Sequence, residues 1–302
     1  MGLIGSELRL QRIIVTVLVI SLLGNLIGLY FASQWLLLRR QEAAKERLLG
    51  ETNKGLLMLA GAMDNLSNGK MIFLHHSVGS GILDQGGLRD GLMKMGISVR
   101  SATYGDSIGE QTDMCDWMPK FRSNMEAILK FRAHPNLYFN DSSSNDIVMF
   151  KSCFPNSQIE PDGSAPGDPL SRQKTIANYK AVFVQLQQEF GRYPDKLFVY
   201  LTFPPLVPSV TNAESASRAR EFNRWLQGPY LTEYRKETGL QNLVIFDLFD
   251  ALADQNGFLK EAYRVMNPGD SHPNLQANRE VAKNFMEYFR PVWISWKDRT
   301  KT

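Results

Sequence analysis

The sequence predicts an α/β fold in which a five-stranded parallel sheet is covered by helices on both faces. The expected strands are short apolar runs at 71–74, 97–104, 146–150, 196–202 and 243–246. The expected helices are longer amphipathic runs at 82–95, 117–131, 175–190, 213–238 and 274–289. Strands of a parallel sheet are buried on both faces and therefore tend to be continuously apolar. Their alternation with helices is typical of this fold class.

The first strand leads directly into the most informative segment of the chain. The apolar run 71–74 is followed by His75, His76 and Ser77, then by a glycine-flanked turn and the helix at 82–95. A strand, a sharp turn and a helix together lift a serine hydroxyl above the carboxyl edge of a sheet. The start of a helix also favours negative charge. Ser77 is therefore a candidate nucleophile and oxyanion donor, with simple helix capping as the alternative.

The later elements are separated by residues that interrupt regular structure. The second strand ends at Gly105, and a loop rich in glycine and proline, 155–169, follows the third strand. The long helix at 213–238 is expected to break near Gly228-Pro229, because proline cannot donate a helical hydrogen bond. The tail at 291–302 carries two tryptophans and is predicted to pack on the domain or to touch a membrane interface.

The amino-terminal region does not follow the globular pattern. Residues 13–38 are almost continuously apolar, and their 26 residues exceed the roughly 20 that span a bilayer as a helix. A cleaved signal or a buried helix are the alternatives. The predicted organisation is a transmembrane anchor at 1–40, a helical stalk and linker at 41–69, a domain at 70–290 and a tail at 291–302. We expect a single-pass membrane protein with an extracytoplasmic domain, although basic residues on both sides of the span leave the orientation open.

Composition excludes some classes of protein. The 302 residues are 43% apolar and 22% charged, which is ordinary globular usage. A net charge of +3 and the lack of a basic stripe argue against nucleic-acid binding. The two cysteines, Cys115 and Cys153, show no metal-binding spacing, and whether they pair is left open.

Polar residues from distant parts of the chain are expected at the same edge of the sheet. Ser77 follows the first strand, and Asp270 and His272 come just before the last helix. Because sites in such sheets lie beyond the carboxyl ends of the strands, these side chains are expected to meet. A serine nucleophile needs a base to take its proton and an acid to orient that base. We therefore expect Ser77 to be the nucleophile, His272 the base and Asp270 the orienting acid.

This arrangement resembles the SGNH (GDSL-type) hydrolase superfamily. That family's four marker blocks contribute a Ser, a Gly, an Asn and a His in chain order, matched here by Ser77, Gly105, Asn156 and His272. The resemblance covers about residues 70–290 and implies a flavodoxin-like three-layer α/β/α sandwich with esterase activity. It also implies that the Gly105 N–H and the Asn156 side chain join the Ser77 N–H in an oxyanion hole.

The sequence departs from the family pattern at three places. His75-His76 replaces the family's Gly-Asp before the serine. The third block is altered, which leaves Ser152 as a rival to Asn156. The acid lies two residues before the histidine instead of three, a spacing that is found in some carbohydrate acetyl-ester and acetyl-transfer relatives.

Three further residues are predicted to contact substrate, namely His76, Lys151 and Asp113. Each has a plain structural alternative, such as a hydrogen-bonded histidine or a salt-bridged lysine. Adjacent strand residues point in opposite directions, so His75 and His76 are not expected to share a metal ion. Trp117, close to Asp113, is expected to pack in the core.

The predicted function is that of a serine esterase acting on a small acyl ester, with O-acetyl groups on saccharides as one substrate class suggested by the resemblance. No metal or organic cofactor is expected. The alternatives are an O-acyltransferase with the same triad and a binding module that keeps the fold without catalysis.

Overall fold

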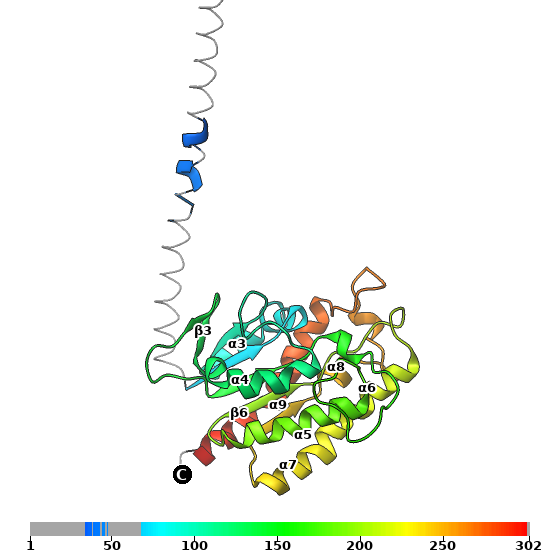
Figure 1. Ribbon diagram of the computed structural model, residues 1–302. Helices are drawn as coiled ribbons and strands as arrows, with labels where there is room; N and C mark the ends of the chain where they lie inside the picture. Colours follow the sequence, from blue (N-terminus) through cyan, green and yellow to red (C-terminus); the bar gives the residue numbers. More distant parts are fainter. Residues whose placement is uncertain (1–33, 38, 43, 46, 48–67, 301–302) are drawn as a thin grey trace, which may run out of the picture. The chain divides into compact units, whose positions relative to one another are not determined.

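The computed structural model describes residues 34–37, 39–42, 44–45, 47 and 68–300 (Figure 1). The chain divides into two compact units, residues 1–65 and 66–302. The described residues of the first unit are helical. The predicted membrane span and stalk lie almost entirely outside the described residues and stay predictions. In the part that is described, no helix has both the length and the hydropathy that a membrane crossing requires.

The second unit is built on the predicted parallel sheet, and all five expected strands are present. They are β1 (Gly69–Leu74), β2 (Ile97–Ala102), β5 (Ile147–Phe150), β6 (Leu197–Leu201) and β7 (Leu243–Phe246). Their order is β2-β1-β5-β6-β7, and every neighbouring pair is parallel. This is the flavodoxin-like order, in which the second strand along the chain lies at one edge. The carboxyl ends of β1 and β5 lie side by side, since Leu74 pairs with Phe150.

Helices cover both faces of the sheet (Figure 1). One face carries α4 (Met114–Lys130), α5 (Ile176–Gly191), α6 (Ala213–Trp225) and α7 (Leu231–Thr238). The other carries η1 (Gly81–Gln85), α3 (Leu88–Lys94) and α9 (Leu275–Thr300). The short helix α8 (Leu248–Leu252) contributes to both cores. Alternate residues of β1 serve the two cores, with Ile72 and Leu74 on the first face and Met71 and Phe73 on the second. Two cores of this kind explain why β5, β6 and β7 are apolar throughout, while the edge strand β2 contains polar residues.

The first helix begins earlier than predicted and is interrupted. It starts at Ser77 as α2 (Ser77–Ser80), continues as η1 and stops at Gly86-Gly87 before α3. A Cβ on Gly86 would lie 2.4 Å from the carbonyl oxygen of Asn278, so α9 packs directly against this backbone. The interruption therefore lets two helices approach closely.

A small hairpin was not predicted. Residues 131–133 form β3 (Phe131–Ala133), which pairs with β4 (Leu137–Tyr138) in an antiparallel arrangement. The helix expected at 117–131 includes Phe131, whereas α4 ends one residue earlier. The helical spacing of apolar residues continues up to Phe131, so this spacing does not indicate that the helix ends and a strand begins.

The carboxyl-terminal half of the domain differs from expectation at two prolines. The expected break near Gly228-Pro229 is a π-helical turn, η3 (Leu226–Tyr230), that joins α6 to α7. Helix α9 continues through Pro291 to Thr300, and Trp293 and Trp296 are buried against the sheet. Of the two alternatives for the tail tryptophans, packing on the domain is the one observed.

Candidate active site

Ser77, His272 and Asp270 form a continuous hydrogen-bonded chain. Ser77 Oγ lies 2.7 Å from His272 Nε2, and Asp270 Oδ1 lies 2.5 Å from His272 Nδ1. Ser77 stands at the carboxyl end of β1, and the other two residues belong to the loop before α9, which is 195 positions further along the chain. The convergence expected from the sequence is therefore observed.

The carboxylate of Asp270 is held ionised by its neighbours. The backbone N–H of His272 donates to Asp270 Oδ1 at 2.9 Å, and this bond is the main reason why the pKa of Asp270 is lowered from its ordinary value. An ionised carboxylate accepts the Nδ1–H of the imidazole, which leaves the Nε2 lone pair facing the Ser77 hydroxyl. This tautomer is the one that can accept the serine proton.

The loop that carries His272 is held on several sides. Ser271 Oγ accepts a hydrogen bond from the Val207 N–H at 3.1 Å, and the Asn274 N–H donates to the Tyr263 carbonyl at 2.8 Å. The ring of Phe154 meets the His272 ring edge-on, with 4.9 Å between centroids. These contacts fix the imidazole, while Ser77 itself is exposed to solvent. A ligand can therefore reach the hydroxyl.

The backbone around Ser77 provides an oxyanion donor. The Ser77 N–H opens α2 and has no intramolecular acceptor among the described residues. A Cβ on Gly79 would lie 2.4 Å from the His75 Cβ, so a glycine is needed for this turn to pack on the strand end. The free N–H and the helix start together favour a negative oxygen beside Ser77 Oγ.

The two other predicted oxyanion donors are engaged elsewhere. The Gly105 N–H donates to Glu110 Oε1 at 2.7 Å. The Asn156 amide donates to Asp113 Oδ1 at 2.9 Å and to the Cys153 carbonyl at 3.1 Å. Its oxygen accepts the N–H that begins α4. Their role in an oxyanion hole stays a prediction, because each donor would first have to leave its present acceptor.

The rival to Asn156 is also engaged inside the protein. Ser152 is fully buried, and its Oγ accepts the indole N–H of Trp117 at 2.8 Å. Trp117 itself lies in the core, as expected. The third block therefore supplies packing and a helix cap in this structure.

Two of the three predicted substrate contacts also have structural partners. His76 Nε2 lies 2.9 Å from the Gly109 carbonyl, and the His76 ring stacks on Tyr104 with 3.9 Å between centroids. Asp113 caps α4 through a capping box with Asp116. The third, Lys151, is fully buried beneath the site. Substrate contact by any of them remains a prediction.

The two adjacent histidines face different partners. His75 is buried, and its Nε2 lies 2.7 Å from Ser101 Oγ on β2, whereas His76 faces the loop after β2. Among the described residues, no group of three or more histidine, cysteine, aspartate or glutamate side chains is arranged to hold a metal ion.

His75 should make the stability of the domain depend on pH. Burial lowers the pKa of His75 from 6.5 to about 4. As the pH falls, His75 is therefore protonated in the unfolded chain before it is protonated in the folded protein. The free energy of unfolding is highest above pH 6.5 and decreases between pH 6.5 and pH 4. We expect urea unfolding to show a loss on the order of 2 kcal/mol between pH 7 and pH 5. In His75→Gln, which stays neutral, most of this loss should disappear. An equal loss in both proteins would contradict the assignment.

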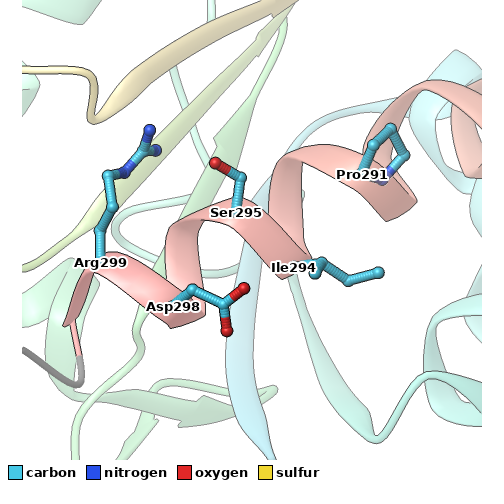
Figure 2. Close-up of a pocket in the computed structure, with 5 residues that line it drawn as sticks. All are labelled: Pro291, Ile294, Ser295, Asp298 and Arg299. Atoms are coloured by element: carbon cyan, nitrogen blue, oxygen red, sulfur yellow. The ribbon is translucent and has the colours of Figure 1, made fainter.

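Two cavities differ in their relation to the triad. One of about 280 Å³ adjoins the loop that carries Asp270 and His272, and it is lined in part by Phe154, Leu206, Val210, Gly269 and Ser271. A second, of about 620 Å³, is lined only by residues of α9, as Figure 2 shows. The first cavity is lined by Gly269 and Ser271, the two neighbours of Asp270 in the chain, whereas the second lies along α9. The first is therefore the better candidate for binding part of a substrate.

Sequence reasoning missed the roles of Glu110, Phe154 and Cys153. Glu110 accepts a hydrogen bond from the Gly105 N–H, and Phe154 packs on His272. Cys153 Sγ lies 3.7 Å from Lys151 Nζ. The one signal in the sequence was that Lys151 and Cys153 lie two residues apart just after a buried strand. Whether the lysine affects the thiol depends on its burial, which the sequence does not give.

Comparisons with known proteins find similar folds only. No protein-family model matches the chain, and no curated protein gives a significant match. A proposed platelet activating factor from Streptococcus pneumonia is 14% identical, with 81% of this chain and 97% of that chain covered and a TM-score of 0.42. A proposed acylhydrolase from Bacteroides fragilis is 13% identical, with coverage of 77% and 94% and a TM-score of 0.44.

A third solved structure is the periplasmic domain of a lipopolysaccharide acetyltransferase from Salmonella ser. Paratyphi A. It is 14% identical, with 74% of this chain and 85% of that chain covered and a TM-score of 0.36. Because one fold hosts many activities, likenesses at this level assign no function.

Proposed function

We propose that the protein is a serine esterase of the SGNH type that hydrolyses small acyl esters. The observation that carries the proposal is the hydrogen-bonded chain from Ser77 Oγ through His272 to Asp270. Ser77 attacks the ester carbonyl while His272 Nε2 takes its proton, and the Ser77 N–H stabilises the oxyanion. His272 then protonates the leaving alcohol, so an acyl-serine remains.

Water completes the cycle from the exposed side of the site. It attacks the acyl-serine as His272 again accepts a proton, and the carboxylic acid leaves with Ser77 restored. Throughout, Asp270 keeps Nδ1–H in place and stabilises the imidazolium. Gly105 and Asn156 enter this scheme only if they exchange their present acceptors for the substrate oxygen.

The surroundings of the triad support a small acyl group and water as its acceptor. The cavity beside the catalytic loop measures about 280 Å³ and includes the apolar side chains of Phe154, Leu206 and Val210. Ser77 is exposed, and the His272 side chain keeps 39% of its surface accessible. Such an open site admits water to the acyl-serine. An acetylated saccharide is the natural first substrate to try, on the strength of the family resemblance.

A fluorophosphonate probe tests the nucleophile directly. We expect one probe molecule to attach covalently to Ser77 in the full-length protein, because activated serines of a triad attack such phosphorus centres. Intact-protein and peptide mass spectrometry measure the attachment. Ser77→Ala should take up none, and Ser80→Ala, changed one turn along α2, should label normally. Absence of labelling in the wild-type protein would favour a binding module without catalysis.

Product analysis distinguishes the hydrolase from the transferase. With p-nitrophenyl acetate, the proposed hydrolase releases one acetate for each p-nitrophenol, with or without a sugar acceptor. Acetylated sugar in place of acetate would show transfer by the same triad.

A further inference from the structure

The two cysteines lie beside groups of opposite charge. Cys153 Sγ is 3.7 Å from the ammonium nitrogen of Lys151, and the residue is half-buried. Cys115 is buried, and its Sγ is 3.8 Å from Asp116 Oδ1. A nearby cation favours the thiolate, whereas a carboxylate opposes it. The same chain therefore contains one thiol that is activated and one that is suppressed.

The amine of Lys151 is buried and lies against the sulfur of Cys153. Its side chain follows β5 and is fully buried. Among the described residues, no carboxylate pairs with its ammonium group, and the sulfur of Cys153 is the one hydrogen-bond acceptor found for it. Burial lowers the pKa of Lys151, an effect that the nearby Cys153 opposes. A buried ammonium group needs a counter-charge, and the thiolate of Cys153 is the group in contact with Lys151 that can supply it.

Neighbouring groups reinforce this state of the thiol. Burial raises the pKa of Cys153, but Lys151 and hydrogen bonding to His76 more than offset it, so the pKa lies below its ordinary value. Burial raises the pKa of Cys115, and Asp116 adds to the shift. The titratable groups near Cys153 are Lys151 from the end of β5, His76 from the β1–α2 turn and Tyr104 from the loop after β2.

We propose that Cys153 is a reactive thiolate and a modification site for peroxides and small electrophiles. In the oxidation, the Cys153 sulfur attacks one oxygen of hydrogen peroxide. An S–O bond forms as the O–O bond breaks, the sulfur loses two electrons, and the peroxide is reduced to hydroxide, which is protonated to water. The product is a sulfenic acid beside Lys151. Low thiol pKa with partial exposure is the combination that selects such cysteines.

The site adjoins the triad but does not depend on it. The next residue, Phe154, packs on the ring of His272, so Cys153 lies one residue from a contact with the proposed base. Modification requires only the thiol, the lysine and the reagent. It should therefore proceed at the same rate in Ser77→Ala, and its failure would be distinct from failure of the esterase proposal.

The test measures both cysteines in one sample of reduced, full-length protein. Iodoacetamide alkylation at pH 7 is followed by peptide mass spectrometry, and a second sample receives hydrogen peroxide with dimedone to trap sulfenic acid. We expect Cys153 to be alkylated about tenfold or more faster than Cys115, with dimedone found on Cys153. The midpoint of its alkylation rate against pH should lie below the roughly 8.5 of an ordinary thiol.

A matched variant isolates the lysine. Lys151→Met keeps an unbranched side chain that is one atom shorter and carries no charge. It should slow alkylation of Cys153 severalfold and raise the pH midpoint, with Cys115 unchanged. Circular dichroism checks that the variant folds. If it does not fold, the comparison of the two cysteines in the wild-type protein still tests the proposal. Equal rates at Cys153 and Cys115, or a folded Lys151→Met that reacts as fast as wild type, would overturn the proposal.

Discussion

Replacing Ser77 with alanine is expected to lower kcat/KM for p-nitrophenyl acetate by roughly three to six powers of ten. The hydroxyl is the only part of the hydrogen-bonded chain that can form the acyl intermediate, and it lies 2.7 Å from its base. Without it, His272 and Asp270 have no serine hydroxyl to activate, and the covalent route is lost. What remains comes from binding and from the Ser77 backbone N–H, which alanine retains.

The assay should use the full-length protein and purified variants side by side. Ser80→Ala serves as the control for a serine lost from α2, and it should retain wild-type kcat/KM. Circular dichroism and thermal unfolding exclude loss of the fold as the cause. Wild-type rates in Ser77→Ala would remove this residue as the nucleophile and with it the proposed mechanism.

Asp270→Asn is expected to lower kcat by about four powers of ten, with a small change in KM. An asparagine side chain can donate to Nδ1 and thereby select the wrong tautomer of His272, which then presents Nε2–H to Ser77 instead of a lone pair. The amide also lacks the charge that stabilises the imidazolium during proton transfer. Stopped or continuous ester assays across substrate concentrations separate kcat from KM.

A second carboxylate in a loop provides the matched control. Asp254 accepts two backbone N–H groups through Oδ1 but contacts no histidine. Asp254→Asn should leave kcat within about twofold of wild type, since exchanges outside the site alter stability more than chemistry. Activity in Asp270→Asn close to that of wild type would show that His272 does not need this partner, and the triad would reduce to a Ser–His pair.

The sheet was predictable because burial on both faces leaves a strong local pattern. The run 71–74 and the three runs that form β5, β6 and β7 are almost entirely apolar, and each is a strand of the parallel sheet. The edge strand β2 is more polar and only partly buried. The triad residues were predictable for a related reason. Ser77 follows a strand end, and His272 precedes a helix at the same edge, so the topology alone brings them close.

Elements without a periodic signature were not predictable in the same way. The residues around Phe131 keep a helical pattern up to the point where β3 begins, and only pairing with β4 establishes the strand. The first helix was placed too late, because its opening at Ser77 depends on close packing of Gly79 against His75.

The amino-acid sequence by itself determined the parallel sheet, the order of its elements and the three residues that meet at its edge, because these follow from local hydrophobicity and chain topology. Only the tertiary structure decided which polar groups are free to act. The side chain of Asn156 is hydrogen-bonded to the start of α4, and the Gly105 N–H donates to Glu110. Lys151 is buried against Cys153. Hydrogen-bond partners and burial arise from contacts between distant segments, and no local pattern records them.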